Sequence, residues 1–262
     1  MAARSIWKGV LKIGTAKLSV KLYSAVQDHT VRFNVLEKRT MTPIKQHIVD
    51  PETDHEVPRE EIRKGYAVDK GTFVLLDDRE LEQFEPKASR DIDVVEFVSP
   101  DLLDHRWYER PYYLGPDGDE KNYFALADAL AGTGKIGIAR WVMRGKQYVG
   151  ALTPNDGYLT LVTLRYAEEV LSAEEIAVPK GKAISQGELK MAEQLVDVLR
   201  GEFRPEEFKD DYRDRLMKFI ETKGRGRKPR LKVVRSKPAA TTDLMDKLTK
   251  SLKAAQKEKK VA

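Results

Sequence analysis

The sequence contains no cysteine, which excludes disulfide bonds, thiolate nucleophiles and cysteine-ligated metals. It has only four histidines, and no two of them have the spacing of a helical metal-ligand pair. We therefore expect no bound metal and no cofactor. We also expect the protein to work in a reducing compartment. No segment approaches 18 uncharged apolar residues, and the N-terminus has no apolar run before Lys8. These absences predict a cytoplasmic protein without a membrane span.

Charge is abundant and unevenly distributed. The net charge is +5, but residues 223–262 hold fourteen lysines and arginines against three acids and so carry +11. Residues 1–222 hold 33 basic and 39 acidic residues, a net charge of −6. We therefore divide the chain into a body over 1–222 and a basic tail over 223–262. Such a tail indicates a polyanionic partner, although a merely solubilising, disordered end fits it equally well.

Alternating apolar residues predict short β-strands over most of the body. The segments concerned are "KLSVKLYSA", its continuation "VRFNVLE", "GTFVLLDD", "DIDVVEFVSP", "RPYYLGP", and three strands between Lys135 and Tyr166 that turn at "RGKQ" and "TPNDG". Residues 38–66 are polar and lack periodicity, which indicates an excursion from the core with at most a short ribbon around "DPETD". This pattern predicts an antiparallel β-sheet or barrel.

Helical patterns occupy the rest of the chain. The segment "NYFALADALAGTG" predicts a short helix that ends at a glycine. Ser185 and Glu188 have the spacing of a capping box before a helix that runs to Gly201. A second helix is predicted from Pro205, with apolar residues at four-residue intervals. A last, weakly apolar helix is predicted after Thr242.

No catalytic motif is complete. The segment "GTGKIG" fails as a phosphate loop, because Ala129 stands where glycine is required and Ile136 where serine or threonine is required. The acid pairs Asp77/Asp78 and Asp210/Asp211 are better explained by a helix-start turn and by the polar side of a helix than by a metal-dependent nuclease. We expect binding rather than catalysis.

The hairpin around "RWVMRGKQ" is the most informative local feature. If the strand is fully extended, Arg140 and Arg144 share one face and lie roughly 13 Å apart, at ~3.3 Å per residue, a spacing that suits two phosphates. Pairing of Arg140 with a strand carboxylate is an equally good interpretation of this arginine alone.

Six ordered segments make the sequence similar to a known family. They are "SIWKGVLKIGTAKLSVKLYSA", "EVPREEIRKGYAVDKGTFVLLDDREL", "RPYYLGPD", "TGKIGIARWVMRGKQYVGAL", "LKMAEQLVD" and "FKDDYRDRL". Together they resemble the bacterial Ku family over about residues 4–222. The resemblance implies a mainly β fold with some α: an antiparallel β-barrel core, a bridge excursion that forms half of a dimeric ring, C-terminal helices and a basic tail.

The resemblance also implies a function and a set of contacts. A ring-shaped homodimer would bind double-stranded DNA ends without sequence specificity, on the nucleoid, and recruit the ATP-dependent ligase, ligase D, in non-homologous end joining. Cations suit contacts to phosphates. By resemblance, the DNA-facing residues are Arg4, Lys8, Lys45, Arg63, Lys64, Arg140, Arg144 and Lys146. The charge of the tail adds Arg225, Arg227, Lys228 and Arg230.

A general nucleic-acid-binding, chromatin-like protein is the alternative. In that case the basic tail binds DNA, the β body only dimerises, and DNA ends are not preferred. For each body cation singly, a position on the outer, solvated face stays open.

Overall fold

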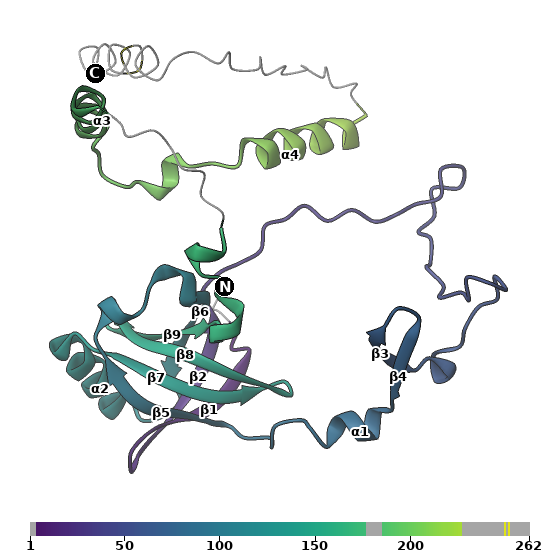
Figure 1. Ribbon diagram of the computed structural model, residues 1–262, viewed down its shortest axis with the longest axis horizontal. Coiled ribbons are helices and arrows are strands. Elements are labelled where there is room, and N and C mark those ends of the chain that lie inside the picture. The colour runs from purple at the N-terminus through teal and green to yellow at the C-terminus, as the bar shows by residue number, and fades with distance from the viewer. Residues whose placement is uncertain (1–3, 177–184, 227–248, 250, 252–262) are drawn as a thin grey trace. The chain divides into compact units, whose positions relative to one another are not determined.

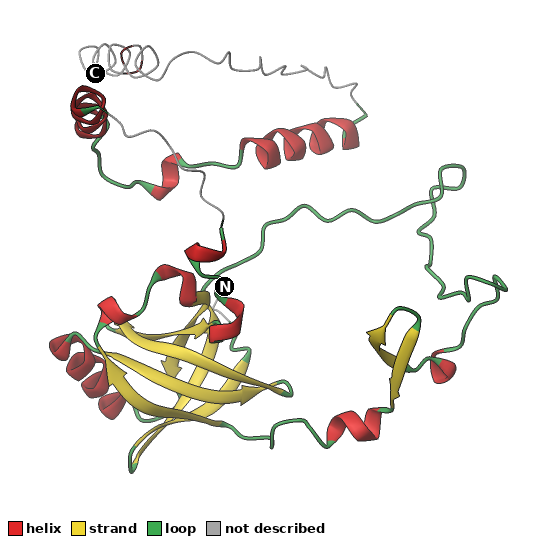
Figure 2. Ribbon diagram, in the orientation of Figure 1, coloured by secondary structure: helices red, strands yellow, loops and turns green. Residues whose placement is uncertain are grey.

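The computed structural model describes residues 4–176, 185–226, 249 and 251, and the chain divides into two units after Glu175. The first unit contains a barrel and a long arm, and the second contains helices (Figures 1 and 2). Among the described residues, no helix combines the length and the apolar composition that spanning a membrane requires.

Seven strands of the first unit close into a barrel in the order β1-β2-β6-β9-β8-β7-β5. They are β1 (Trp7–Ile13), β2 (Ala16–Ser24), β5 (Asp91–Val98), β6 (Tyr108–Pro116), β7 (Ile136–Met143), β8 (Lys146–Asn155) and β9 (Tyr158–Leu164). The predicted barrel is thus confirmed. One pair departs from the antiparallel expectation, because β1 and β5 run parallel, with Leu11 opposite Ile92. A parallel pair needs a long crossover, and here the whole arm provides it.

Alternation along the strands fills the barrel with aliphatic side chains. Leu11, Val20, Leu22 and Leu161 are at most 1% exposed, as alternate residues of half-buried strands should be. Helix α2 (Glu120–Thr133) adds Tyr123, Ala127 and Leu130 to the same core, and it ends at Gly134 in the left-handed conformation, as predicted. The Tyr123 hydroxyl donates to the carbonyl of Leu114 and accepts from the amide of Leu159.

A smaller cluster lies on the outer face of the barrel. It joins Ile136, Ala151 and Leu164 to Leu103 and Trp107, which come from the segment between β5 and β6. That segment contains two short 3-10 turns, η2 (Pro100–Leu102) and η3 (His105–Trp107). The outer face of β7 is therefore partly covered.

The arm comprises residues 25–90 and follows a different rule: no side chain in this range is buried. It contains η1 (Arg59–Glu61), β3 (Lys64–Asp69), β4 (Thr72–Leu76) and α1 (Asp78–Glu82), with β3 and β4 paired only to each other. The strand predicted over "VRFNVLE" is wrong, since only Leu36 forms an isolated bridge there, with Pro43. Strands β1 and β3 were not predicted, whereas the short ribbon around "DPETD" is confirmed by the bridge between Val49 and Glu56.

The chain after the barrel forms short turns and helices. The turns η4 (Ala167–Glu169) and η5 (Ala173–Glu175) end the first unit. In the second unit, α3 (Gln186–Val198) has the predicted capping box of Ser185 with Glu188. Helix α4 (Asp211–Gly224) starts later than predicted, because Pro205 begins only η6 (Pro205–Glu207) and Asp210 is the N-cap. Apart from residues 249 and 251, the helix predicted after Thr242 lies outside the described residues.

Candidate nucleic-acid interface

Strand direction collects many cations at one end of the barrel. The start of β1 lies at this end, and so, by the pairing of the strands, do the end of β2, the start of β5, the start of β6 and the hairpin between β7 and β8. The arm therefore leaves and re-enters the barrel here, after Ser24 and before Asp91. We call this the arm-side end. The cations at the strand termini and turn of this end are Arg4, Arg90, Arg106, Arg110, Arg144, Lys146 and Arg165.

The β7–β8 hairpin turns through Arg144 and Gly145, both with positive φ, 54° and 73°. Met143 pairs with Lys146, so the loop has two residues and the geometry of a type I′ turn. This corrects the expected spacing of Arg140 and Arg144 along one extended strand, because β7 ends at Met143 and Arg144 lies in the turn. Arg140 itself is exposed on β7, beside Asp93 of β5, but forms no ion pair or hydrogen bond with any described residue.

The barrel contains a second turn of the same type for comparison. The β8–β9 hairpin turns through Asp156 and Gly157, with φ of 49° and 78°. Aspartate and asparagine are favoured at such a position, whereas a long side chain at positive φ is uncommon. The arginine at residue 144 is thus a poorer choice for the turn than an asparagine would be.

Electrostatics connect this hairpin to its neighbours. Burial raises the pKa of Tyr112 on β6, and the positive charges of Arg110 and Arg144 act against that rise. The Arg110 guanidinium lies over the Tyr112 ring, 5.7 Å from its centroid. The hairpin tip therefore contributes to the positive field at the arm-side end.

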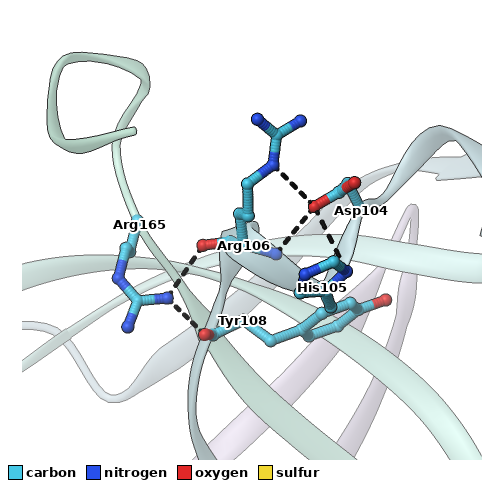
Figure 3. A network of polar contacts seen from close by, with 5 residues as sticks. All are labelled: Asp104, His105, Arg106, Tyr108 and Arg165. Atoms are coloured by element: carbon cyan, nitrogen blue, oxygen red, sulfur yellow. Dashed lines mark hydrogen bonds and ion pairs between the residues drawn. The ribbon is translucent and has the colours of Figure 1, made fainter. Parts of the chain in front are cut away.

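Figure 3 shows that Arg165, at the same end, has a different role. Its Nη1 donates to the carbonyl oxygen of Arg106, at 2.8 Å, and to that of Tyr108. Asp104 in turn accepts from the backbone amide and the Nε of Arg106, both at 2.9 Å, and lies 3.5 Å from Nδ1 of His105. Arg165 thus fixes the segment that covers the outer cluster.

The predicted body cations fall into two groups. Arg4, Lys45, Arg140, Arg144 and Lys146 are exposed and have no side-chain partner among the described residues. Lys8 is paired with Asp117 at 3.0 Å, and Lys21 with the same carboxylate at 2.6 Å. Their hydrogen bonds lower the pKa of Asp117, with that from Lys21 first in size.

Two predicted cations lie next to each other in the arm. Arg63 donates to the carbonyls of Glu60 and Ile62, and Lys64 is 2.9 Å from Asp78. Exposed pairs of this kind contribute ~0–1 kcal/mol, so a phosphate could replace the carboxylate at little cost.

The predicted tail cations are mostly outside the described residues. Arg225 follows α4 as its C-cap, in the second unit, while Arg227, Lys228 and Arg230 are not described. Arg90 and Arg110 were not among the DNA-facing cations predicted from the sequence, although both lie at the arm-side end. Arg90 could have been found, because it immediately precedes a predicted strand.

The described residues contain no group of three His, Asp or Glu side chains that could hold a metal ion. The predicted role of Asp77 is confirmed: it caps α1 and forms a capping box with Glu80. Asp210 also caps a helix, α4, rather than lying on its polar side. Each acid pair thus supplies one helix cap.

Comparison with known proteins identifies the family. Residues 12–191 match the model of the Ku70/Ku80 beta-barrel domain. The chain belongs to the Ku family. It is 37% identical to non-homologous end joining protein Ku 2 of Geotalea uraniireducens (strain Rf4), over 97% of this chain and 99% of that protein. It is 34% identical to non-homologous end joining protein Ku of Coxiella burnetii (strain RSA 331 / Henzerling II), over 100% of this chain and 98% of that protein.

Ku membership accounts for the architecture described above. The matched residues include β2 to β9, the arm and the first part of α3, so the arm lies within the matched range. The hairpin and the arm-side end lie within the same range.

Proposed function

We propose that a homodimer of this chain binds double-stranded DNA ends without sequence specificity and acts in non-homologous end joining, where it recruits ligase D. Membership of the Ku family and the names of its relatives support the repair role. On this proposal the protein is a binding factor rather than an enzyme, and it works on the nucleoid in the cytoplasm.

The Arg-Gly hairpin is the observation that carries DNA binding. Its tip places an arginine in a turn position that disfavours arginine, next to Lys146, and neither side chain has a partner in the part of the chain that the structure describes. A solubilising surface would not need this choice, since Asp156 occupies the equivalent position of the other hairpin. Flexible cations without carboxylate partners suit phosphates, which are the same for every sequence.

The arm supports the homodimer. In the β3–β4 hairpin, Tyr66 lies opposite Val74 on one face, and Ala67 opposite Phe73 on the other. Both faces are therefore apolar, yet Tyr66 and Phe73 are 68% and 60% exposed. A two-stranded hairpin is marginal alone, and large apolar surfaces mark protein interfaces. A second copy of the arm is the partner that this proposal requires.

End dependence is the decisive test, because a closed protein ring can load onto DNA only by threading. We expect linear duplexes to compete for the protein, whereas covalently closed circles of equal mass do not, in a gel-shift assay. Equal competition by circles would instead favour the tail-driven, chromatin-like alternative. Stimulation of end joining by purified ligase D, on linear DNA only, tests recruitment.

A further inference from the structure

A pocket lies where the arm re-enters the barrel. Its volume is about 430 Å³, within the range of ~300–1,000 Å³ that is typical of small-molecule sites. Its lining comes from the start of β1, the segment before β5 and the β7–β8 hairpin, and includes Trp7, Glu85, Ala88, Ser89, Arg90 and Arg144. Binding to the phosphates of a DNA backbone needs a cationic surface but no concave pocket. The pocket therefore requires its own explanation.

Trp7 forms a fixed aromatic wall of the pocket. Its ring lies over Gly9, where a Cβ atom would come within 2.2 Å of the indole, and the carbonyl of Arg90 is also within 2.6 Å of that position. Glycine at residue 9 is therefore required for this placement of the ring. The indole also packs against the barrel core, so it is held in place before any ligand binds.

The polar groups of the pocket favour an anion. Arg90 and Arg144 have no side-chain partner among the described residues, and Glu85 is the single carboxylate of the lining. Ser89 accepts the backbone amide of Asp91 at 3.0 Å, which leaves its hydroxyl proton available for donation. Two guanidinium groups with one hydroxyl suit a phosphate, and the net charge of the lining is +1 before a ligand enters.

The remaining carboxylate selects among phosphate-bearing ligands. The carboxylate of Glu85 faces Gly145, with Oε2 3.5 Å from the position of a Cβ there. A carboxylate accepts only, so it repels bare phosphate and favours a ligand that also carries N–H or O–H donors. A nucleotide combines a phosphate, a flat base that stacks on tryptophan, and donors on the base and sugar.

We propose that this pocket binds one nucleoside monophosphate group, with the base against Trp7 and the phosphate between Arg90 and Arg144. Two sources share this chemistry: a free mononucleotide, and the unpaired terminal nucleotide of a DNA overhang. The second source rests on the proposed function, because it requires a DNA end at the arm-side end of the barrel. The first does not.

Titration of the full chain with dAMP tests the shared chemistry. Isothermal titration calorimetry and quenching of tryptophan fluorescence should both show saturable binding. Deoxyadenosine and inorganic phosphate, each lacking half of the ligand, should bind at least about tenfold more weakly, since stacking and charge pairing each contribute at least that factor. Equal binding of phosphate alone would overturn the assignment to a nucleotide.

Variants locate the site. Ala88→Phe fills the pocket and Arg90→Met removes one guanidinium, and both should weaken dAMP binding about tenfold or more. Lys121→Met, on α2, removes the same charge from the opposite end of the barrel and should leave dAMP binding unchanged. Circular dichroism checks that each variant is folded. Loss of dAMP binding in Lys121→Met, or retention in both pocket variants, would overturn the proposal.

Duplexes with blunt ends and with one-nucleotide overhangs separate the two sources. If the pocket takes a terminal nucleotide, the wild-type protein prefers the overhang, and Ala88→Phe removes this preference without changing blunt-end affinity. If dAMP binds but the two duplexes are equal, the source is the free nucleotide. Intact blunt-end binding with neither dAMP binding nor overhang preference refutes the pocket alone. A wild-type protein that binds dAMP but does not bind any DNA end refutes the proposed function alone.

Discussion

The barrel and the arm of this chain both contain strands with large apolar residues, but the barrel buries these side chains and the arm exposes them. In the barrel, Leu22 and Leu161 are fully buried, because the strands close on themselves and enclose every alternate side chain. In the arm, Phe73 and Leu75 also lie on a paired strand, β4, yet they are 60% and 68% exposed. The barrel thus buries its own apolar side chains, whereas those of the arm are exposed and are the surface on which the proposed dimer depends.

Charging the arm hairpin should produce the largest effect. Phe73→Glu with Leu75→Glu places two carboxylates on one face of β3–β4, opposite Ala67 and Gly65. We expect the dimer to dissociate, so that light scattering gives the 29.8 kDa of one chain rather than twice that mass. End binding should be lost at concentrations that saturate the wild-type protein.

Lys70→Glu is the matched control for this experiment. It changes the net charge by the same two units, but in the turn of the same hairpin rather than on its apolar face. It should leave the dimer intact. A double variant that stays dimeric would show that the hairpin is not the interface.

Truncating a barrel side chain should affect folding stability, whereas truncating an arm side chain should affect dimerisation. Leu22→Ala should cost about 2–5 kcal/mol of the free energy of unfolding, because it leaves a cavity inside the barrel. Phe73→Ala should change the urea midpoint of the barrel transition by little, while it weakens dimerisation. Equal losses in the two variants at low protein concentration would mean that the arm folds with the barrel as one cooperative unit.

Sequence patterns predicted the parts of the chain whose physical cause is local. The β7–β9 strands, the glycine end of α2 and the Ser185 capping box all follow from neighbouring residues, and all are confirmed. The strand wrongly predicted in the arm has a non-local cause. The segment "VRFNVLE" alternates as a strand should but finds no neighbouring strand to pair with, apart from an isolated bridge at Leu36. Strand β1 was missed although it pairs with the adjacent β2 across a short turn as well as with β5, so distance along the chain does not explain this miss.

The candidate site divides in the same way. The proposal that Arg144 and Lys146 contact DNA follows from the hairpin sequence, since a turn needs only adjacent residues. The pairing of Lys8 with Asp117 and the pocket around Trp7 join segments from separate strands. Such contacts depend on barrel closure, and no local pattern in the chain indicates them.

A substitution in one of the two type I′ hairpins of the barrel should change stability and DNA affinity by smaller amounts. Arg144→Asn supplies a residue that the turn favours and removes a charge. We expect it to raise the free energy of unfolding by up to about 1 kcal/mol. DNA affinity should fall, and the salt slope should decrease by about 0.9 if one phosphate contact is lost.

Asp156→Asn in the other hairpin provides the control, because it should leave DNA affinity and its salt slope nearly unchanged. Unfolding by urea and gel shifts at several salt concentrations measure both properties. An Arg144→Asn variant that is less stable and binds as tightly as the wild-type protein would contradict the role assigned to this arginine.

The smallest effect concerns Asp117, which is shared by Lys8 and Lys21 on the barrel wall. These lysines lower its pKa in the folded state, so the folded protein holds the charged carboxylate more firmly than the unfolded chain does. The resulting stability is present above about pH 4, the ordinary pKa of an aspartate, and is lost as the pH falls through the lowered pKa.

Asp117→Asn should therefore be less stable than the wild-type protein at pH 7 and equal to it near pH 2, by urea unfolding. Asp128→Asn, which removes an exposed carboxylate on α2 with no partner among the described residues, is the control and should leave the stability at pH 7 nearly unchanged. Because the same change frees Lys8 for phosphate, Asp117→Asn should also bind linear DNA slightly more tightly, and weaker binding would place Lys8 away from the DNA.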